Sequence, residues 1–99
     1  MFFDFDWDAD KARSNLKKHE VSFRLATSIF HDPLAITIFD DDHSQDEDRW
    51  ISMGRAGNGQ VLVVVHTSEE VGAAELHIRI ISARRAEREE VRDYEQTPR

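Results

Sequence analysis

One stretch of the chain carries the residue types that phosphodiester cleavage needs, which are a proton acceptor, a proton donor and a cation. His77 and Arg79 alternate with apolar residues in a predicted strand, 75–82, and therefore share one face of it. If the loop that joins this strand to the preceding one is centred near Val71 and Gly72, His66 lies opposite His77 and Val64 lies opposite Arg79. Two imidazoles and a guanidinium on one patch could move protons and stabilise a phosphate. The alternative is that both histidines are structural or solvated, because a one-residue slip moves the set to the other face.

A second group of cations lies near the C-terminus. The chain from residue 83 to about 95 contains neither glycine nor proline, and so favours a helix. At helical spacing Arg84, Arg88 and Arg92 form a stripe, with Arg85 beside it. Such a stripe could hold an RNA backbone or an acidic partner. The alternative is an ordinary surface helix whose arginines pair with neighbouring acidic residues.

The remaining charged clusters have simpler explanations. Lys17, Lys18 and His19 end the first predicted helix, where the carbonyl end of the helix dipole stabilises cations. The acidic segment Asp40–Asp48 invites a metal hypothesis, but its spacing matches no calcium-binding loop and the bracketing glycine and glutamate of such a loop are absent, so a solvated loop is expected. The chain has no cysteine, no glycine-rich phosphate loop and no His-Glu-x-x-His motif, so we predict neither a metal nor a cofactor.

The size and charge of the chain narrow the choice of function. Its 99 residues fit one domain, 1–99, with a modest core. The formal net charge of −7 argues against a general nucleic-acid binder, although the arginines still form a local basic patch. The longest apolar runs are too short to span a bilayer, and the N-terminus lacks the pattern of a signal peptide. We therefore expect a cytoplasmic protein.

The periodicity of the rest of the chain predicts the α+β class. The expected elements are, in order, a short N-terminal strand at 3–7, a helix at 9–18, a second helix that starts after Ser22 and stops before Pro33, four strands at 34–39, 50–54, 60–67 and 75–82, and the C-terminal helix. The valine-rich segment 60–67 is expected to be central. Because short turns join neighbouring strands, the sheet is predicted to be antiparallel, with the helices packed on it.

Several blocks of residues follow one another in a recognisable order. The first fits the pattern W-D-x-x-K-x-x-x-N-x-x-K-H-x-V-x-F, through Trp7, Asp8, Lys11, Asn15, Lys18, His19, Val21 and Phe23. The later blocks are Phe30-His31-Asp32-Pro33, Arg49, Gly54, Val63–Thr67, and Arg79-Ile80-Ile81-Ser82-Ala83-Arg84-Arg85-Ala86 with Glu90 and Tyr94. Together they resemble the BrnT-type toxins, the ribonuclease half of a bacterial type II toxin–antitoxin pair. Val91 departs from that pattern, because the family usually has a basic residue there.

The resemblance implies a RelE-like fold and RNA cleavage that blocks translation. It also implies neutralisation, in a hetero-oligomer, by a BrnA-type antitoxin with a ribbon-helix-helix domain. That antitoxin would contact the operator, so the toxin would meet DNA only indirectly. By extension from RelE-like enzymes, the ribose 2′-hydroxyl would attack its own 3′ phosphate without a metal.

The residues expected to act on RNA fall into two groups. Arg79 and Arg84 would stabilise the transition state with help from Lys18 or His19, and His66, or failing that His77, would transfer protons. The cations expected to bind RNA are Arg55, Arg85, Arg88, Arg92 and Lys17. Two alternatives remain, a non-catalytic module that binds the antitoxin and an acidic mimic of nucleic acid that presents the Asp40–Asp48 loop.

Overall fold

The computed structural model describes residues 2–98 and is organised around one long strand, β6. The helices are α1 (Ala9–His19), α2 (Phe23–Thr27) and α3 (Arg88–Gln96), with 3₁₀ turns η1 (Ser28–His31) and η2 (Asp41–His43). The strands are β1 (Phe2–Trp7), β2 (Ile36–Phe39), β3 (Trp50–Arg55), β4 (Val61–His66), β5 (Glu69–Gly72) and β6 (Glu75–Arg85). No helix within residues 2–98 is long and apolar enough to cross a membrane.

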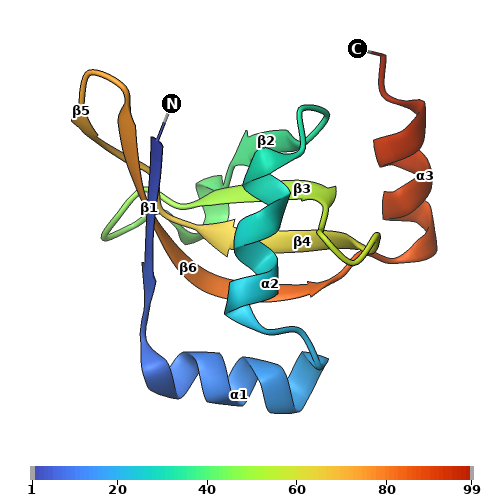
Figure 1. The fold of residues 1–99 in the computed structure, drawn as a ribbon, viewed down its shortest axis with the longest axis horizontal. Coiled ribbons are helices and arrows are strands. Elements are labelled where there is room, and N and C mark those ends of the chain that lie inside the picture. Colours follow the sequence, from blue (N-terminus) through green and yellow to red (C-terminus); the bar gives the residue numbers. More distant parts are fainter. Residues whose placement is uncertain (1, 99) are drawn as a thin grey trace.

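The six strands form a single mixed sheet in the order β1-β6-β4-β3-β2, with β5 also paired to β6 (Figure 1). The strands joined by turns are antiparallel, as predicted, but β1 pairs with β6 in parallel. The expectation of a wholly antiparallel sheet overlooked this pairing, because β1 and β6 are far apart in the sequence and no turn fixes their direction. The α+β class and the central position of β4 are confirmed.

The two N-terminal helices begin where their capping residues predict. The Asp8 carboxylate accepts from the backbone N–H of Lys11 at 3.0 Å, and the Ser22 hydroxyl accepts from that of Leu25 at 3.0 Å. The second helix tightens into η1 and ends before Pro33, since the residue before proline avoids the helical region.

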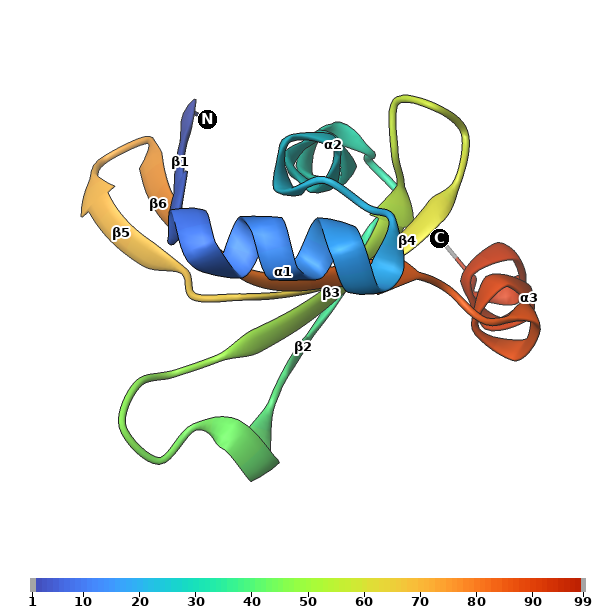
Figure 2. The same cartoon turned by 90° about the horizontal axis from the view of Figure 1, so that it is seen from below.

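The core lies on one side of the sheet. Phe23, Ala26 and Ile29 from α2 and η1 pack on Leu62 and Ile78 of the central strands, and all are almost fully buried. Figures 1 and 2 show α2 lying across this face, while α1 runs beside β6 and α3 stands beyond its end. We call the face under α2 the covered face and the opposite one the outer face.

The C-terminal third of the chain differs from the prediction in two places. Strand β6 continues to Arg85, so the helix predicted from residue 83 starts only at Arg88. Backbone pairing decides this, because Ala83 and its neighbours are in register with β4, and a capping box of Glu87 and Glu90 then starts α3. The segment 68–75, predicted to be a loop, contains strand β5.

Candidate functional site

A bulge in β6 decides which of its side chains share a face. Val65 pairs with Ser82 but His66 pairs with Ile80, so Ile81 is an extra residue on β6. Before the bulge Ile78 and Ile80 face the core, and after it Ala83 does. Arg79, Ser82 and Arg84 therefore all point to the outer face, which strict alternation would not allow for residues 79 and 84.

Helix α1 is fastened to the open edge of β6 by one buried side chain. The Asn15 amide donates to the carbonyl of Ala83 at 2.8 Å and to that of Val21 at 2.9 Å, and its oxygen accepts from the Ala83 N–H at 3.1 Å. It thus pairs with β6 as a strand would, beyond the point where β1 ends. The C-terminal end of α1 is consequently held beside the second half of β6.

A cavity of about 330 Å³ opens between α1 and β6, and we call it the α1–β6 pocket. Its lining consists of polar and charged side chains of the helix together with two residues of the bulged strand: Asp10, Lys11, Ser14, Asn15, Lys18, His19, Ile81 and Ser82. The structure thus brings together Lys18 and His19, two of the predicted catalytic residues, and adds Lys11. Three basic side chains line the pocket against one acidic side chain, Asp10, which is paired with Arg13, and this arrangement can bind a phosphate.

Lys11, Ser14 and Ser82 were not among the predicted site residues. A signal for Lys11 was present in the sequence, because Lys11 and Lys18 are seven residues apart and so lie on one face of the helix. Ser82 carries no comparable signal, since its direction depends on the bulge.

Arg84 also lies on the outer face, but in a different role from the one expected. It belongs to β6, not to the start of a helix, and forms a two-pronged ion pair with Glu90 of α3 at 2.8 and 2.9 Å. The hydrogen bonds of this pair raise the pKa of Arg84 and lower the pKa of Glu90. Arg84 therefore fixes α3 to the sheet while its side chain remains partly exposed.

Arg79 lies on the same face but at the other end of it. Arg84 is five residue steps further along the strand, which corresponds to roughly 16 Å, so the structure does not bring these two arginines together at one phosphate. A cavity beside Arg79 is lined by His77, Asp6, Glu47, Asp48 and Glu69, together with Thr67 and Ser68. These acidic side chains oppose the binding of an anion.

His77 is held as part of this acidic region. Its ring lies 2.9 Å from the Asp4 carboxylate through Nδ1 and 3.4 Å from Asp6 through Nε2. The hydrogen bond to Asp4 raises the pKa of His77, and the charge of Asp6 adds to the effect.

His66 lies on the opposite, covered face and does not meet His77. The prediction that the two histidines face each other is wrong, because His66 pairs with Ile80 and shares its face, whereas His77 lies three residues earlier on β6 and points to the other face. Its ring is buried, with Nε2 2.7 Å from the Ser52 hydroxyl and Nδ1 2.8 Å from the Thr67 carbonyl. Burial lowers the pKa of His66, although the hydrogen bond to Thr67 opposes this.

The five residues predicted to bind RNA are dispersed. Arg55 lies over the Tyr94 ring and 3.6 Å from Glu95, while Arg85 lies 3.4 Å from Glu20. Arg88 and Arg92 line a shallow cavity on α3 with Ala86, Val91 and Glu95. Lys17 is exposed on α1 and is not part of the α1–β6 pocket.

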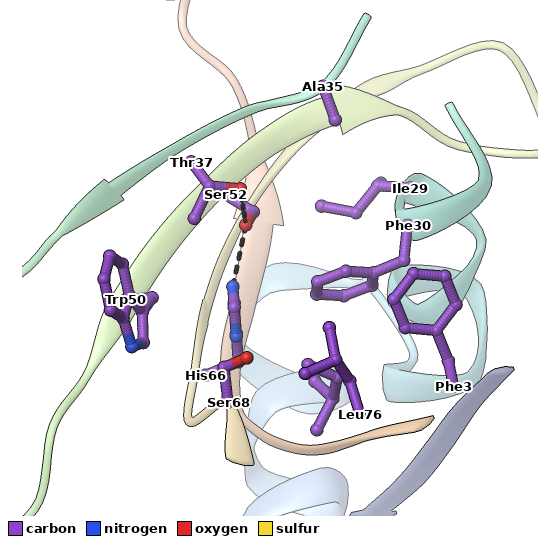
Figure 3. Close-up of a pocket in the computed structure, with 11 residues that line it drawn as sticks. Phe3, Ile29, Phe30, Ala35, Thr37, Trp50, Ser52, His66, Ser68 and Leu76 are labelled. Carbon is purple, nitrogen blue, oxygen red and sulfur yellow. Dashed lines mark hydrogen bonds between the residues drawn. The ribbon is translucent and has the colours of Figure 1, made fainter. Parts of the chain in front are cut away.

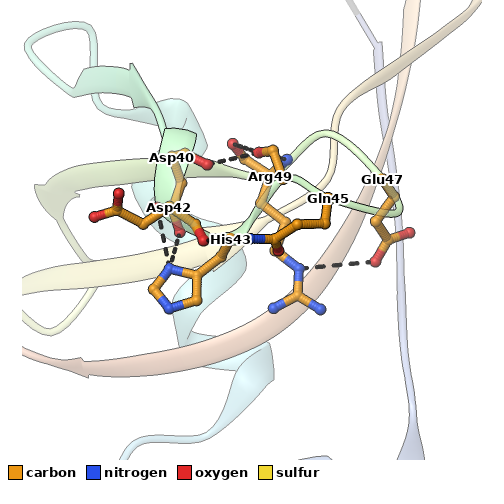
Figure 4. A network of polar contacts seen from close by, with 7 residues as sticks. Asp40, Asp42, His43, Gln45, Glu47 and Arg49 are labelled. Carbon is orange, nitrogen blue, oxygen red and sulfur yellow. Dashed lines mark hydrogen bonds and ion pairs between the residues drawn. The ribbon is translucent and has the colours of Figure 1, made fainter.

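The acidic loop is ordered by its own side chains (Figure 4). His43 lies 3.1 Å from the buried Asp40 carboxylate, Gln45 donates to the carbonyl of Asp42, and Arg49 lies 3.9 Å from Glu47. Within residues 2–98, no three histidine or acidic residues are grouped so that they could hold a metal ion.

Comparison with known proteins identifies the family. The sequence pattern of "Ribonuclease toxin, BrnT, of type II toxin-antitoxin system" matches residues 7–90. The crystal structure of the Brucella abortus ribonuclease toxin BrnT is similar in fold, with a TM-score of 0.54 at 22% identity over 89% of this chain and 100% of that one. No curated protein in the comparison matches. Because the family pattern spans most of the chain, the chain belongs to the BrnT family of ribonuclease toxins of type II toxin–antitoxin systems.

Proposed function

We propose that this ribonuclease toxin cleaves RNA at the α1–β6 pocket, by a reaction that needs no metal and that stops translation in the cytoplasm. The observation that carries the proposal is the gathering of Lys11, Lys18 and His19 around one pocket beside Ser82. Elsewhere on the outer face, Arg84 is paired with Glu90 and Arg79 stands among acidic side chains. The pocket is therefore where a phosphate meets the most favourable charge.

The reaction is an attack of the ribose 2′-hydroxyl on the adjacent 3′ phosphate. The bond from the 2′ oxygen to phosphorus forms, the bond to the 5′ oxygen breaks, and a 2′,3′-cyclic phosphate remains. His19, the histidine of the pocket, takes the proton of the 2′-hydroxyl, and a lysine ammonium supplies one to the leaving oxygen. Lys11 and Lys18 neutralise the extra negative charge of the pentacovalent phosphate.

The other predicted cations act outside the pocket in this proposal. Arg84 lies two residues beyond Ser82 on the same face, and its role is to hold α3 against the sheet through Glu90. Arg79 takes no part in the pocket, since it stands among acidic side chains at the other end of the face. His66 takes no part, since it is buried on the covered face.

The partner is an antitoxin, as the type II class implies, and we propose that it is a BrnA-like ribbon-helix-helix protein. Arg88 and Arg92 on α3, with Val91 between them, offer a basic surface with an apolar centre for its acidic segment. Arginines at the rim of a protein–protein interface mainly affect the rate of association and its salt dependence. Arg88→Glu should therefore weaken the salt dependence of complex formation, and an unchanged dependence would exclude this surface.

A chelator experiment tests the proposed chemistry. Purified protein is incubated with labelled RNA in single turnover, with and without a strong chelator, and the new RNA ends are analysed. We expect equal rates and 2′,3′-cyclic phosphate ends. Loss of cleavage in chelator that magnesium restores, or 3′-hydroxyl ends, would contradict the mechanism.

A further inference from the structure

The covered face contains a cavity of about 330 Å³ that is separate from the α1–β6 pocket and that the proposed reaction does not use (Figure 3). One wall is apolar and includes the rings of Phe3 and Phe30, whose centroids are 5.9 Å apart. Leu76 and Ile29 extend this wall, and Trp50 lines the cavity from β3. None of the side chains that line it is an acid, a lysine or an arginine, so it is not suited to a phosphate.

The opposite wall is polar, and its hydrogen bonds run in one direction. The Nδ1 of His66 is 2.8 Å from the Thr67 carbonyl, which can only accept, so Nδ1 carries the proton. In the neutral ring Nε2 is then an acceptor, and the Ser52 hydroxyl donates to it at 2.7 Å. The Ser52 oxygen lies 2.7 Å from the Thr37 hydroxyl, which must be the donor of that bond. Figure 3 shows Ser52 between Thr37 and His66.

The direction of these hydrogen bonds determines what kind of ligand group Thr37 can bind. The Thr37 hydroxyl has already donated its hydrogen, so its oxygen has only acceptor capacity left for a ligand. An apolar cavity with a few convergent polar groups is typical of small-ligand sites. Flat aromatic walls favour a flat ligand, because rings stack or meet edge to face.

We propose that this cavity binds a planar aromatic group carrying one hydrogen-bond donor, an indole or a phenol, whose N–H or O–H is accepted by Thr37. The ring lies against the apolar wall, beside the edge-to-face pair of Phe30 and His66, whose centroids are 4.9 Å apart. The group belongs either to a free small molecule or to a tryptophan or tyrosine side chain of a bound polypeptide, and the chemistry of recognition is the same. This site is independent of RNA cleavage.

Methylation of the indole nitrogen removes the hydrogen-bond donor of indole without changing its ring. Indole and 1-methylindole are each titrated into the ¹⁵N-labelled protein, and amide shifts are followed by NMR. We expect saturable binding of indole, with a Kd of roughly 0.1–1 mM as is ordinary for a fragment of this size. The binding of 1-methylindole should be about 5- to 10-fold weaker, the value of one neutral hydrogen bond. The largest shifts should fall at residues 50–52 and 66–68.

Variants on the protein side complete the test. Thr37 is exposed on an edge strand, so Thr37→Val should fold and should remove the difference between the two probes, while Thr37→Ser keeps it. Ser68, exposed among the lining residues, gives a second pair: Ser68→Trp should abolish indole binding and Ser68→Ala should preserve it. Circular dichroism checks the fold of each variant.

Binding of N-acetyltryptophan amide as well as indole would show that the cavity accepts the ring on a peptide backbone, as a polypeptide ligand requires, whereas binding of indole alone would restrict the ligand to a free small molecule. Equal affinity for indole and 1-methylindole in the parent protein, or shifts remote from β3 and β4, would overturn the proposal.

Discussion

Two histidines on opposite faces of the sheet show how differently the faces are built. On the covered face His66 is a buried link between Ser52 and Thr67, and burial lowers its pKa. On the outer face the hydrogen bond to Asp4 raises the pKa of His77. The covered face thus keeps its imidazole neutral and its polar groups paired, whereas charge is placed on the outer face.

The outer face is itself divided. At one end acidic side chains surround Arg79, and at the other the α1–β6 pocket gathers Lys11, Lys18 and His19. A chain with a net charge of −7 can therefore present one local site for a phosphate. Substitutions on the covered face should therefore change stability, and substitutions at the reactive end of the outer face should change the rate of cleavage.

The largest effect is expected from Lys18→Ala. Removing one preorganised cation at a phosphate costs about 2.7–4 kcal/mol, or roughly 10²–10³ in the rate of cleavage. Lys17→Ala is the matched control, because Lys17 is also exposed on α1 but does not line the pocket. Single-turnover rates of the two variants should differ widely, and equal losses would show only that α1 needs positive charge.

Asn15→Ala should cause the largest loss of stability. It leaves the buried polar groups of Ala83 and the carbonyl of Val21 without partners, at a cost of about 1–3 kcal/mol for each unsatisfied group. Urea unfolding measures the loss, and cleavage should fall as well because α1 loses its position beside β6. A variant as stable as the parent protein would mean that Asn15 does not hold the helix.

Ser52→Ala should destabilise the protein without slowing the reaction. It removes the donor to Nε2 of buried His66, which costs about 1–2 kcal/mol. Thr37→Val is the milder comparison, because Thr37 is exposed. The rate of cleavage below the unfolding temperature should match that of the parent, and a reduced rate in folded protein would place His66 in the reaction after all.

The smallest effect is in the pH dependence of stability. In the folded protein the pKa of His77 lies above 6.5. The stability that protonated His77 contributes is therefore complete below pH 6.5 and is lost as the pH rises through the pKa of the folded state. The folded pKa of His66 lies below 6.5, so stability is lost as the pH falls from 6.5 toward the folded value. His77→Gln should therefore lose more stability on acidification than the parent. An equal or smaller loss in urea titrations on both sides of pH 6.5 would contradict these assignments.

The sequence predicted most elements of the fold because their signals are local. Capping residues marked the helix starts, and the valine run marked the central strand. The bulge at Ile81 has no such marker, since no glycine or proline stands there. One extra residue turns every later side chain of β6 to the other face, which is why Ser82 could not be assigned to the pocket. The pairing of His66 with His77 was wrong because it assumed a symmetric loop where β5 lies, and the helical setting of Arg84 was wrong because β6 continues its pairing with β4.

The candidate site shows the same limit. Lys18 and His19 could be predicted because they end a helix whose boundaries were clear. Ser82 could not, because its place in the pocket requires both the bulge and the Asn15 contact that brings α1 to β6. Contacts between residues distant in sequence, and not local propensity, assemble this site.

The location of the RNA phosphate can be measured directly. An oligonucleotide with 2′-deoxyribose at the cleaved position cannot react, so it can be titrated into ¹⁵N-labelled protein and followed by NMR. Our account predicts that the largest shifts fall on the lining of the α1–β6 pocket, around Lys11, Lys18, His19 and Ser82, and that His66 and Trp50 stay unchanged. Shifts centred on His66 and Trp50, with α1 unaffected, would contradict it.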